Sequence, residues 1–361
     1  MARYAMIMAG GSGTRLWPMS RAAMPKQLVP FIDGRSLLEI AGERIAGLVP
    51  AERRLVCAAD AYRELVLAAV PGLEARNVLG EPIGRDTLNA VGFTAAVLAA
   101  RDPDAIFCVL TADHLITPQT TFESCMQTGF ALVEADPTRF ATFAITPTHP
   151  ATGYGYVEYG DAVPGFAPAV RCKRFVEKPD IKRAQEYVAS GRFGWNSGMF
   201  VLHARTVLDA IARFRPDNHA GLMRIHDAAA RGADLARTVA EVYPSLPKVS
   251  VDVALMEPAS VDASLSVCTV PMPVEWKDVG SWPSWGSTLA ADDAGNRASC
   301  ATEHVGSTNV VVASDDPSHT VATIGLDQVI IVRTKDATLV CRADLAEQVK
   351  DLVARLPPPL R

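Results

Sequence analysis

Blocks of apolar and polar residues alternate along the first 290 positions at the spacings that strands and helices require. Short apolar runs predict buried strands, and apolar positions three and four residues apart predict amphipathic helices. The expected strands are 4–8, 55–58, 77–79, 106–110 and 140–145, and the helices between them are 36–48, 62–70, 87–100 and 122–134. Because strand and helix follow one another in turn, the pattern predicts an α/β fold with a doubly wound, mostly parallel sheet.

Polar residues mark the starts of three of these helices. Ser36 and Glu39 form a capping-box pattern in front of an apolar stretch. Thr87 is expected to cap the alanine-rich helix, and Asp180 is expected to cap a later helix that runs to Val188.

After Pro147 the pattern changes to one typical of antiparallel strands mixed with helices. Strands are expected at 152–158, 170–176 and 195–202, helices at 206–212, 222–231 and 234–242, and further elements at 251–256, 265–270 and 276–282. These elements complete a large domain, predicted to cover residues 1–290.

A small-residue, acidic stretch at 290–296 predicts a linker. Beyond it, short β-rich runs at 309–313, 320–324, 328–332 and 338–341 precede a helix expected at 343–356. Their even spacing predicts a small β domain or a few turns of β-helix at residues 297–361.

Composition narrows the functional classes. The net charge of −5 argues against general affinity for nucleic acid or anionic membranes. The seven cysteines show neither a disulfide framework nor a zinc spacing, which favours reduced thiols. No apolar run reaches the roughly 18 residues that span a membrane, and no signal peptide pattern precedes Gly10. A cytoplasmic location is expected.

A glycine-rich loop follows the first predicted strand. Three glycines within four residues (Gly10, Gly11 and Gly13) let the backbone turn sharply and present N–H groups to an anion. Glycines alone usually mark a turn. Here Arg15, Arg21 and Lys26 add positive charge where phosphates would lie, so the combination favours a phosphate site.

The loop matches neither common phosphate motif. No lysine follows Gly13, as a Walker loop requires, and Leu16 stands where the Rossmann fingerprint needs a third glycine. The segment Gly10-Gly-Ser-Gly-Thr-Arg-Leu-Trp-Pro18, with Pro25-Lys-Gln27 downstream, instead resembles the signature of sugar-phosphate nucleotidylyltransferases, specifically mannose-1-phosphate guanylyltransferases. The resemblance extends over nearly the whole chain.

The resemblance implies transfer of GMP from GTP to alpha-D-mannose 1-phosphate, with Mg²⁺ or another divalent cation bound by Asp113 and Asp278. Asp113 ends an apolar strand, whereas Asp278 in Asp-Val-Gly could equally begin a turn. Lys26 is assigned to the α-phosphate and Arg15 to the departing pyrophosphate. Nucleotide contacts are expected along the loop and near the third strand, from Ala9, Gly10, Gly11, Ser12, Gly13, Thr14, Arg15, Lys26, Glu81, Arg85 and Asp86.

The sugar phosphate is assigned to a second group of residues by the same resemblance. Lys178 would hold its phosphate, Glu177 and Asn196 would bond sugar hydroxyls, and Gly153 would let the backbone approach the ring. Asp252 is a weaker sugar candidate, and capping a helix is an equal alternative for it.

Glu81 suggests how the base is chosen. Guanine presents two adjacent donors, and an ionised carboxylate can accept both, so we expect Glu81 to select guanine. The loop that follows Glu81 departs from the family pattern at one position. Asp86 stands where relatives usually have Asn, so the contacts of that loop with the nucleoside are in doubt.

Other functions stay open at this point. The same chemistry on another sugar 1-phosphate, such as a heptose, and a catalytically silent sugar-nucleotide sensor are alternatives. A nicotinamide dehydrogenase is disfavoured by the missing third glycine. The resemblance also implies a homodimer, a short left-handed β-helix at the C-terminus, and no isomerase activity, since the cupin domain of longer relatives is not seen.

Overall fold

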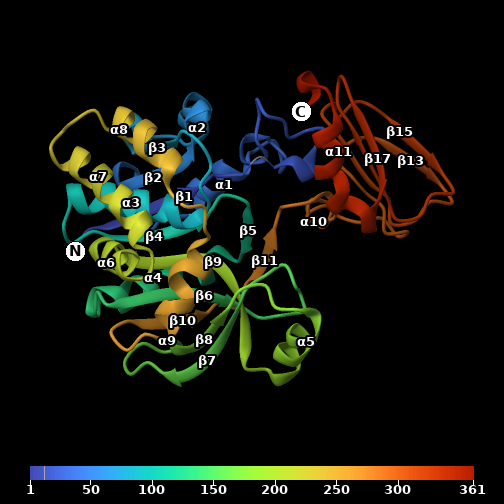
Figure 1. The fold of residues 1–361 in the computed structure, drawn as a ribbon. Coiled ribbons are helices and arrows are strands. Elements are labelled where there is room, and N and C mark those ends of the chain that lie inside the picture. The colour runs from blue at the N-terminus through green and yellow to red at the C-terminus, as the bar shows by residue number, and fades with distance from the viewer. Residues whose placement is uncertain (12) are drawn as a thin grey trace. The chain divides into compact units, whose positions relative to one another are not determined.

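The computed structural model describes residues 1–11 and 13–361, and the chain forms two compact units (Figure 1). The first unit comprises Met1–Gly10, Ala41–Ala112 and Ile116–Trp276. The second unit comprises Gly11–Ile40, Asp113–Leu115 and Lys277–Arg361. The chain therefore leaves the first unit directly after Gly10 and again after Ala112, at the two places where the sequence predicts phosphate and metal contacts. The domain boundaries expected from the sequence remain predictions.

The first unit is an α/β structure around a mixed sheet, as expected. Its strand order over the described residues is β3-β2-β1-β4-β9-β6-β10-β8-β7, and β7 also pairs with β9. The strands are β1 Arg3–Met8, β2 Arg54–Ala59, β3 Val78–Glu81, β4 Ile106–Thr111, β6 Arg139–Ile145, β7 Tyr156–Ala162, β8 Val170–Val176, β9 Phe193–His203 and β10 Ser266–Pro271.

Strand direction places the functional segments at one edge of this sheet. Strands β1, β2, β3 and β4 are mutually parallel, and β9 runs antiparallel to both β4 and β6. The carboxyl ends of β1, β3, β4 and β6 therefore lie at one edge, where β9 begins. Asn196, near the start of β9, pairs with Ala144 at the end of β6. Parallel sheets bind ligands at this edge.

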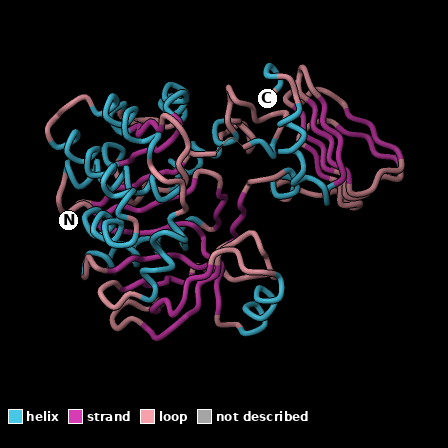
Figure 2. The backbone as a smooth tube through the Cα atoms, viewed as in Figure 1, coloured by secondary structure: helices cyan, strands magenta, loops and turns pink. Residues whose placement is uncertain are grey.

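Helices lie against the strands of the first unit's sheet (Figure 2). Side chains of α3, α6 and α7 share one buried core with β1, β4 and β9, which includes Val91, Ile211 and Leu222. The helices of this unit are α2 Arg63–Ala69, α3 Thr87–Arg101, α4 Gln119–Ala135, α5 Ile181–Ser190, α6 Ala204–Phe214, α7 Pro216–Ala230, α8 Leu235–Val242 and α9 Glu257–Val261. Helix α1, Leu37–Arg44, begins in the second unit and ends in the first.

The second unit contains parallel strands that stack without intervening helices. Val311 pairs with Ile330, and Thr302 pairs with Val321, so in these two pairs the partner lies 19 residues further along (330 − 311 and 321 − 302). Such stacking confirms the predicted turns of β-helix; a left-handed twist remains a prediction. The strands are β12 Arg297–Ala298, β13 Thr302–Val305, β14 Val311–Ser314, β15 Val321–Ile324, β16 Val329–Arg333 and β17 Thr338–Arg342.

The β-helix buries its apolar side chains against aromatic residues that flank the glycine loop. Trp17 and Phe31 share a core with Trp282 and Trp285 of helix α10, Trp282–Gly286, and with β-helix side chains such as Val311. The expected C-terminal helix is split into a 3-10 segment, Ala343–Gln348, followed by α11, Val349–Arg355.

The structure contains several short strands that the sequence did not predict. β5, His114–Thr117, pairs with β11, Glu275–Asp278, and β12 and β13 were also not predicted. These strands have two to four residues each, too few to display a period.

The capping box before α1 is confirmed. The Ser36 hydroxyl accepts from the backbone N–H of Glu39 at 3.2 Å, and the Glu39 carboxylate accepts from the backbone N–H of Ser36 at 2.7 Å. Two donors that the helix start would otherwise leave unpaired are thereby satisfied.

We predict that Ser36→Ala lowers the free energy of unfolding by about 1 kcal/mol, because one capping bond is lost. Urea unfolding followed by circular dichroism measures the change. Ser287→Ala is the matched control, since that exposed hydroxyl bonds only the carbonyl of Ser284. Equal stability of the two variants would contradict the contribution of the capping box.

Candidate active site

The glycine loop is shaped by contacts that exclude a side chain. Gly13 has a φ of 62°, and a Cβ there would lie 2.6 Å from Cβ of Lys26 and 2.7 Å from Oγ of Ser20. Gly11 has a φ of 94°. Both residues therefore need to be glycine, and Gly13 brings the loop directly against Lys26. Ser12, which the sequence assigns to nucleotide binding, lies outside the described residues.

The other predicted loop residues take up fixed positions. The backbone N–H of Ala9 donates to the carbonyl of Cys57 at 2.8 Å, which holds the end of β1 beside β2. Thr14 begins a 3-10 turn, Thr14–Leu16, and accepts from the backbone N–H of Trp17. Arg15 is the middle residue of this turn.

Lys26, Asp113 and Asp278 form the chemical centre of the second unit. Nζ of Lys26 lies 2.6 Å from Oδ2 of Asp113 and also donates to the carbonyl of Val279 at 3.3 Å. The backbone N–H of Val279 donates to the carbonyl of Asp113 at 2.9 Å, which fixes the segment carrying Asp278 beside Asp113. Three residues that are far apart in the sequence thus meet, and the catalytic role assigned to them remains a prediction.

The two carboxylates of this cluster differ in their ionisation. Burial alone would raise the pKa of Asp113, but the charges of Lys26 and His114 and the Lys26 hydrogen bond bring it down to about 2. Burial and the negative charge of Asp113 raise the pKa of Asp278 to about 6, although Lys26 and Arg15 oppose the shift. The repulsion between the carboxylates would be relieved by a bound cation.

The donor set suits a hard divalent cation. Ligand atoms of Asp113, His114 and Asp278 lie within 4.8 Å of one another. Carboxylate oxygens are the ligands that Mg²⁺ prefers, whereas a histidine nitrogen is not. Asp113 and Asp278 fit the metal site that the sequence predicts, and His114, with Nε2 3.9 Å from Oδ1 of Asp113, supports the first carboxylate.

Arg15 belongs to the same cluster and has a partner that the sequence did not reveal. Nη1 of Arg15 lies 3.0 and 3.1 Å from the two carboxylate oxygens of Glu347. A Cβ on Gly280 would lie 3.3 Å from Oδ1 of Asp278 and 3.7 Å from Nη2 of Arg15, so the guanidinium stands beside Asp278. Arg15 is well placed for a phosphate, and Glu347 occupies it in this structure.

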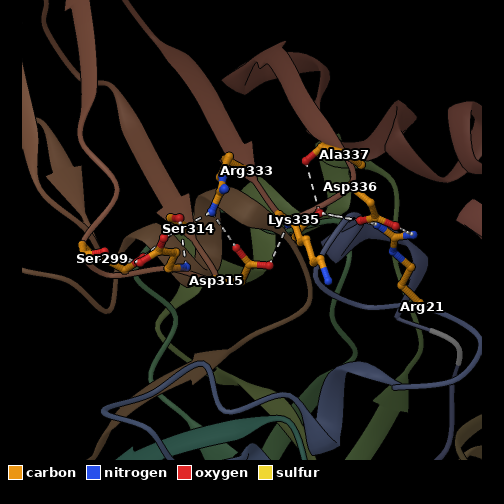
Figure 3. A network of polar contacts seen from close by, with 11 residues as sticks. Arg21, Ser299, Ser314, Asp315, Arg333, Lys335, Asp336 and Ala337 are labelled. Atoms are coloured by element: carbon orange, nitrogen blue, oxygen red, sulfur yellow. Dashed lines mark hydrogen bonds and ion pairs between the residues drawn. The ribbon is translucent and has the colours of Figure 1, made fainter.

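Arg21 does not face the expected phosphate position. Figure 3 shows its guanidinium against Asp336, with ion-pair distances of 2.6 and 3.1 Å. The guanidinium also lies 5.9 Å from the centroid of the Trp17 ring. In the same view Asp315 accepts from Arg333 and from the backbone N–H of Lys335. Arg21 therefore joins the loop to the β-helix, which corrects its assignment to phosphate.

The predicted base-selecting residue lies in the first unit. Glu81 ends β3 and is 7% exposed, and Oε1 accepts from the hydroxyl of Tyr243 at 2.6 Å. A Cβ on Gly10 would lie 3.9 Å from Oε2 of Glu81, so the carboxylate sits next to the first glycine of the loop. No sequence pattern had indicated Tyr243.

Asp86, rather than Thr87, caps helix α3. Oδ1 of Asp86 accepts from the backbone N–H of Thr87 at 2.8 Å, and Asp86 has a φ of 68°. The hydroxyl of Thr87 instead accepts from the backbone N–H of Val251 at 2.8 Å. The additional negative charge thus stabilises a helix N-terminus. Arg85 donates to the carbonyl of Pro244; the nucleotide contacts of Arg85 and Asp86 remain predictions.

The residues assigned to the sugar phosphate form a second acidic cluster with a lysine. Nδ2 of Asn196 donates to Oδ1 of Asp252 at 2.9 Å, and Nζ of Lys178 lies 2.8 Å from Oε1 of Glu177. Burial, and then the charge of Glu177, raise the pKa of Asp252 to about 7. The four side chains therefore share one electrostatic environment.

Gly155, rather than Gly153, is the crowded glycine of the adjoining loop. A Cβ on Gly155 would lie 2.7 Å from Oε2 of Glu177 and 3.3 Å from Cβ of Asn196, whereas a Cβ on Gly153 would meet nothing within 4 Å. The carbonyl of Gly155 also accepts from the backbone N–H of Asn196. The repeated Gly-Tyr pairs at 153–156 are the signal that could have found it.

Two further observations complete this cluster. Asp252 is the first residue of a π-helical turn, and the hydroxyl of Ser250 caps the helix by accepting from the N–H of Val253 at 3.3 Å, so the capping alternative for Asp252 is wrong. Three aromatic rings next to Asn196 were not predicted: the ring centroid of Tyr154 lies 5.2 Å from that of Trp195 and 5.0 Å from that of Trp276.

Known families match both units. A family model described as "Nucleotidyl transferase" matches residues 4–293, and one described as "MannoseP isomerase/GMP-like beta-helix domain" matches residues 303–356. The match over residues 4–293 shows that the chain contains a nucleotidyl transferase domain. No helix in the described part of the chain has the length and apolar character of a membrane span.

Similar proteins define the family more narrowly. Mannose-1-phosphate guanylyltransferases from Klebsiella pneumoniae and Escherichia coli are each 37% identical over 351 residues, which are 96% of this chain and 72% of theirs. A Thermus thermophilus structure described as a mannose-1-phosphate geranyltransferase has a TM-score of 0.84 and 31% identity, over 98% of this chain and 99% of that chain. The chain belongs to the mannose-1-phosphate guanylyltransferase family.

We predict that Asp278→Asn weakens binding of Mn²⁺ by about tenfold or more, because one of two carboxylate ligands is lost. Electron paramagnetic resonance of free Mn²⁺ measures the affinity without reference to catalysis. Asp316→Asn removes an exposed carboxylate elsewhere in the same unit and is the control. Unchanged Mn²⁺ affinity in Asp278→Asn would exclude this carboxylate from the metal site.

We also predict that Asp252→Asn stabilises the first unit at high pH. The pKa of Asp252 is about 7 in the folded chain and near 3.8 when unfolded, so ionisation costs stability as pH rises from 4 to 7, and that cost persists above 7. The variant should gain on the order of 1–2 kcal/mol over the wild type at pH 8 and almost nothing at pH 4, after allowance for partial solvent access. Denaturant unfolding at both pH values measures it; equal differences at the two would contradict the shift.

Proposed function

We propose that this chain transfers GMP from GTP to alpha-D-mannose 1-phosphate and releases GDP-mannose and pyrophosphate. A phosphate oxygen of the sugar attacks the α-phosphorus of GTP, and the bond from that phosphorus to the bridging oxygen of the β-phosphate breaks. The attacking oxygen is already an anion, so no strong base is required. The observation that carries the proposal is the convergence of Lys26, Arg15, Asp113 and Asp278 around a family-specific glycine loop.

The reaction requires groups that bring anions together and align them. Lys26, held at Asp113, supplies a buried positive charge for the α-phosphate as negative charge builds up there. Arg15 would exchange Glu347 for the departing pyrophosphate, because a triphosphate carries more charge than one carboxylate. Mg²⁺ held by Asp113 and Asp278 would supply charge neutralisation at the phosphate oxygens.

The acidic cluster of the first unit suits the sugar phosphate. Lys178 would hold the phosphate, and Glu177 and Asn196 would bond sugar hydroxyls. Gly155, next to Glu177, joins this set, and the approach of Gly153 to the sugar ring remains a prediction. Asp252 would accept from a hydroxyl or remain with Asn196, according to its protonation.

Other expectations from the sequence stay untested, and the homodimer among them rests on the family resemblance. A homodimer, a cytoplasmic location and the absence of nucleic acid partners remain predictions. The names of the relatives support mannose 1-phosphate over a heptose phosphate as the acceptor, and they support an enzyme over a silent sensor.

The test is pyrophosphate release in Mg²⁺, with GTP, ATP, UTP and dTTP crossed against several sugar 1-phosphates. We expect release with GTP and mannose 1-phosphate, and a loss of about 10²–10³-fold in kcat/KM for Lys26→Met, because a preorganised charge at the reacting phosphate is removed. Lys182→Met, an exposed lysine on α5, is the matched control.

Each of the other results has a defined meaning. Release with GTP and a different sugar would change the acceptor and keep the chemistry. GTP binding without release from any pair would overturn catalysis in favour of a sensor. Full activity in Lys26→Met would contradict the role assigned to this lysine.

A further inference from the structure

Glu81 and Tyr243 form a buried pair that the proposed chemistry does not itself require. Tyr243 begins a 3-10 turn, Tyr243–Ser245, 162 residues beyond Glu81, and it is fully buried. Its hydroxyl donates to Oε1 of Glu81 at 2.6 Å. A carboxylate and a phenol are rarely buried together without a specific purpose, because both lose their hydration.

The two oxygens of Glu81 have different surroundings. Oε1 receives the Tyr243 hydroxyl, whereas Oε2 faces the position where Gly10 leads into the glycine loop. The thiol of Cys57 and the backbone N–H of Arg85 also donate to the Glu81 carboxylate. Three donors on one carboxylate restrict its rotation, and a Cβ on Gly10 would lie 3.9 Å from Oε2.

We infer that Tyr243 is a positioning residue for base selection, which holds the Glu81 carboxylate oriented toward the N1–H and 2-amino group of guanine. The inference rests on the proposed use of GTP and adds a second residue to its specificity. A carboxylate that rotates freely would accept donors in many directions, whereas a fixed one discriminates between bases by the position of the donors.

Inosine triphosphate separates this role from phosphate binding. Its base keeps N1–H and lacks the 2-amino group, while its triphosphate and ribose are those of GTP. An enzyme that reads both donors with a fixed carboxylate should prefer GTP to ITP, because ITP leaves part of a buried acceptor unpaired. The preference, expressed as a ratio of kcat/KM values, cancels effects on the phosphates.

The hydroxyl of Tyr243 also affects the ionisation of Glu81. Burial raises the pKa of Glu81, bonds from Tyr243, Arg85 and Cys57 lower it, and the charge of Asp86 raises it. Loss of the hydroxyl should therefore raise this pKa further. The protonated acid cannot accept from both guanine donors with both oxygens, so the GTP preference should disappear at a higher pH than in the wild type.

Tyr243→Phe is the direct test, because it removes the hydroxyl and leaves the ring that packs on Phe93 at a centroid distance of 5.8 Å. We expect the GTP/ITP ratio of kcat/KM to fall about tenfold, with the loss growing as pH decreases. Tyr4→Phe is the matched control, because the Tyr4 hydroxyl also faces a carboxylate, that of Asp102 at 3.4 Å. Thermal unfolding of both variants verifies that they are folded.

Glu81→Gln distinguishes this inference from the proposal on which it rests. If Glu81→Gln keeps the GTP/ITP ratio, Glu81 does not select the base, and the assignment of Tyr243 fails with it. If Glu81→Gln lowers the ratio and a folded Tyr243→Phe does not, the role of Glu81 stands and that of Tyr243 is overturned.

The double variant Glu81→Gln/Tyr243→Phe removes both partners of the hydrogen bond. It tests whether Tyr243 acts through Glu81 even if the single tyrosine variant does not fold. We expect its GTP/ITP ratio to equal that of Glu81→Gln alone, since Tyr243 acts through the carboxylate. A further fall of the same size in the double variant would show an effect independent of Glu81 and overturn the inference. Absence of activity with GTP in the wild type would refute the proposed function instead.

Discussion

The structure depends most on the ion pair between Lys26 and Asp113. Both side chains are largely buried, and an isolated buried charge is costly. Each charge must therefore be balanced by the other. Gly13 makes the pair possible, because any larger residue would displace the Lys26 side chain. The carbonyl of Val279, bonded to the same ammonium, brings Asp278 next to the pair. One buried lysine thus assembles residues from three distant parts of the chain.

Much of this arrangement could be predicted from the sequence, because local patterns and a long motif agree. The strands of the parallel part of the sheet and the capping box at Ser36 are confirmed. Lys26, Asp113 and Asp278 lie together, whereas their catalytic role remains a prediction. Partners that depend on tertiary contact were not: Glu347 lies 332 residues from Arg15. Thr87 was predicted to cap α3, and only the hydrogen bond from its backbone N–H to Asp86 shows that Asp86 is the cap. The charge of Arg21 also suits a phosphate, and its partner Asp336 lies 315 residues further along the chain, so the sequence could not indicate this ion pair.

The two charged clusters use one principle in different units. Each combines two carboxylates with a lysine: Asp113, Asp278 and Lys26 in one, and Glu177, Asp252 and Lys178 in the other. In each, one carboxylate is bound to the lysine, and the other has a raised pKa, near 6 for Asp278 and near 7 for Asp252. In each cluster the lysine balances one carboxylate, and the second carboxylate can take up a proton or a cation. Neither carboxylate therefore has to remain as an uncompensated buried charge.

Base selection follows the same physical requirement. A carboxylate that reads guanine must be buried to exclude water, yet burial favours its neutral form. Donors from Tyr243, Cys57 and the backbone of Arg85 offset that tendency at Glu81, and Asp86 opposes them. Because Asp86 is itself engaged as the cap of α3, part of its charge is compensated by the helix N-terminus. The charge of Asp86 nevertheless contributes to the net upward shift of the Glu81 pKa.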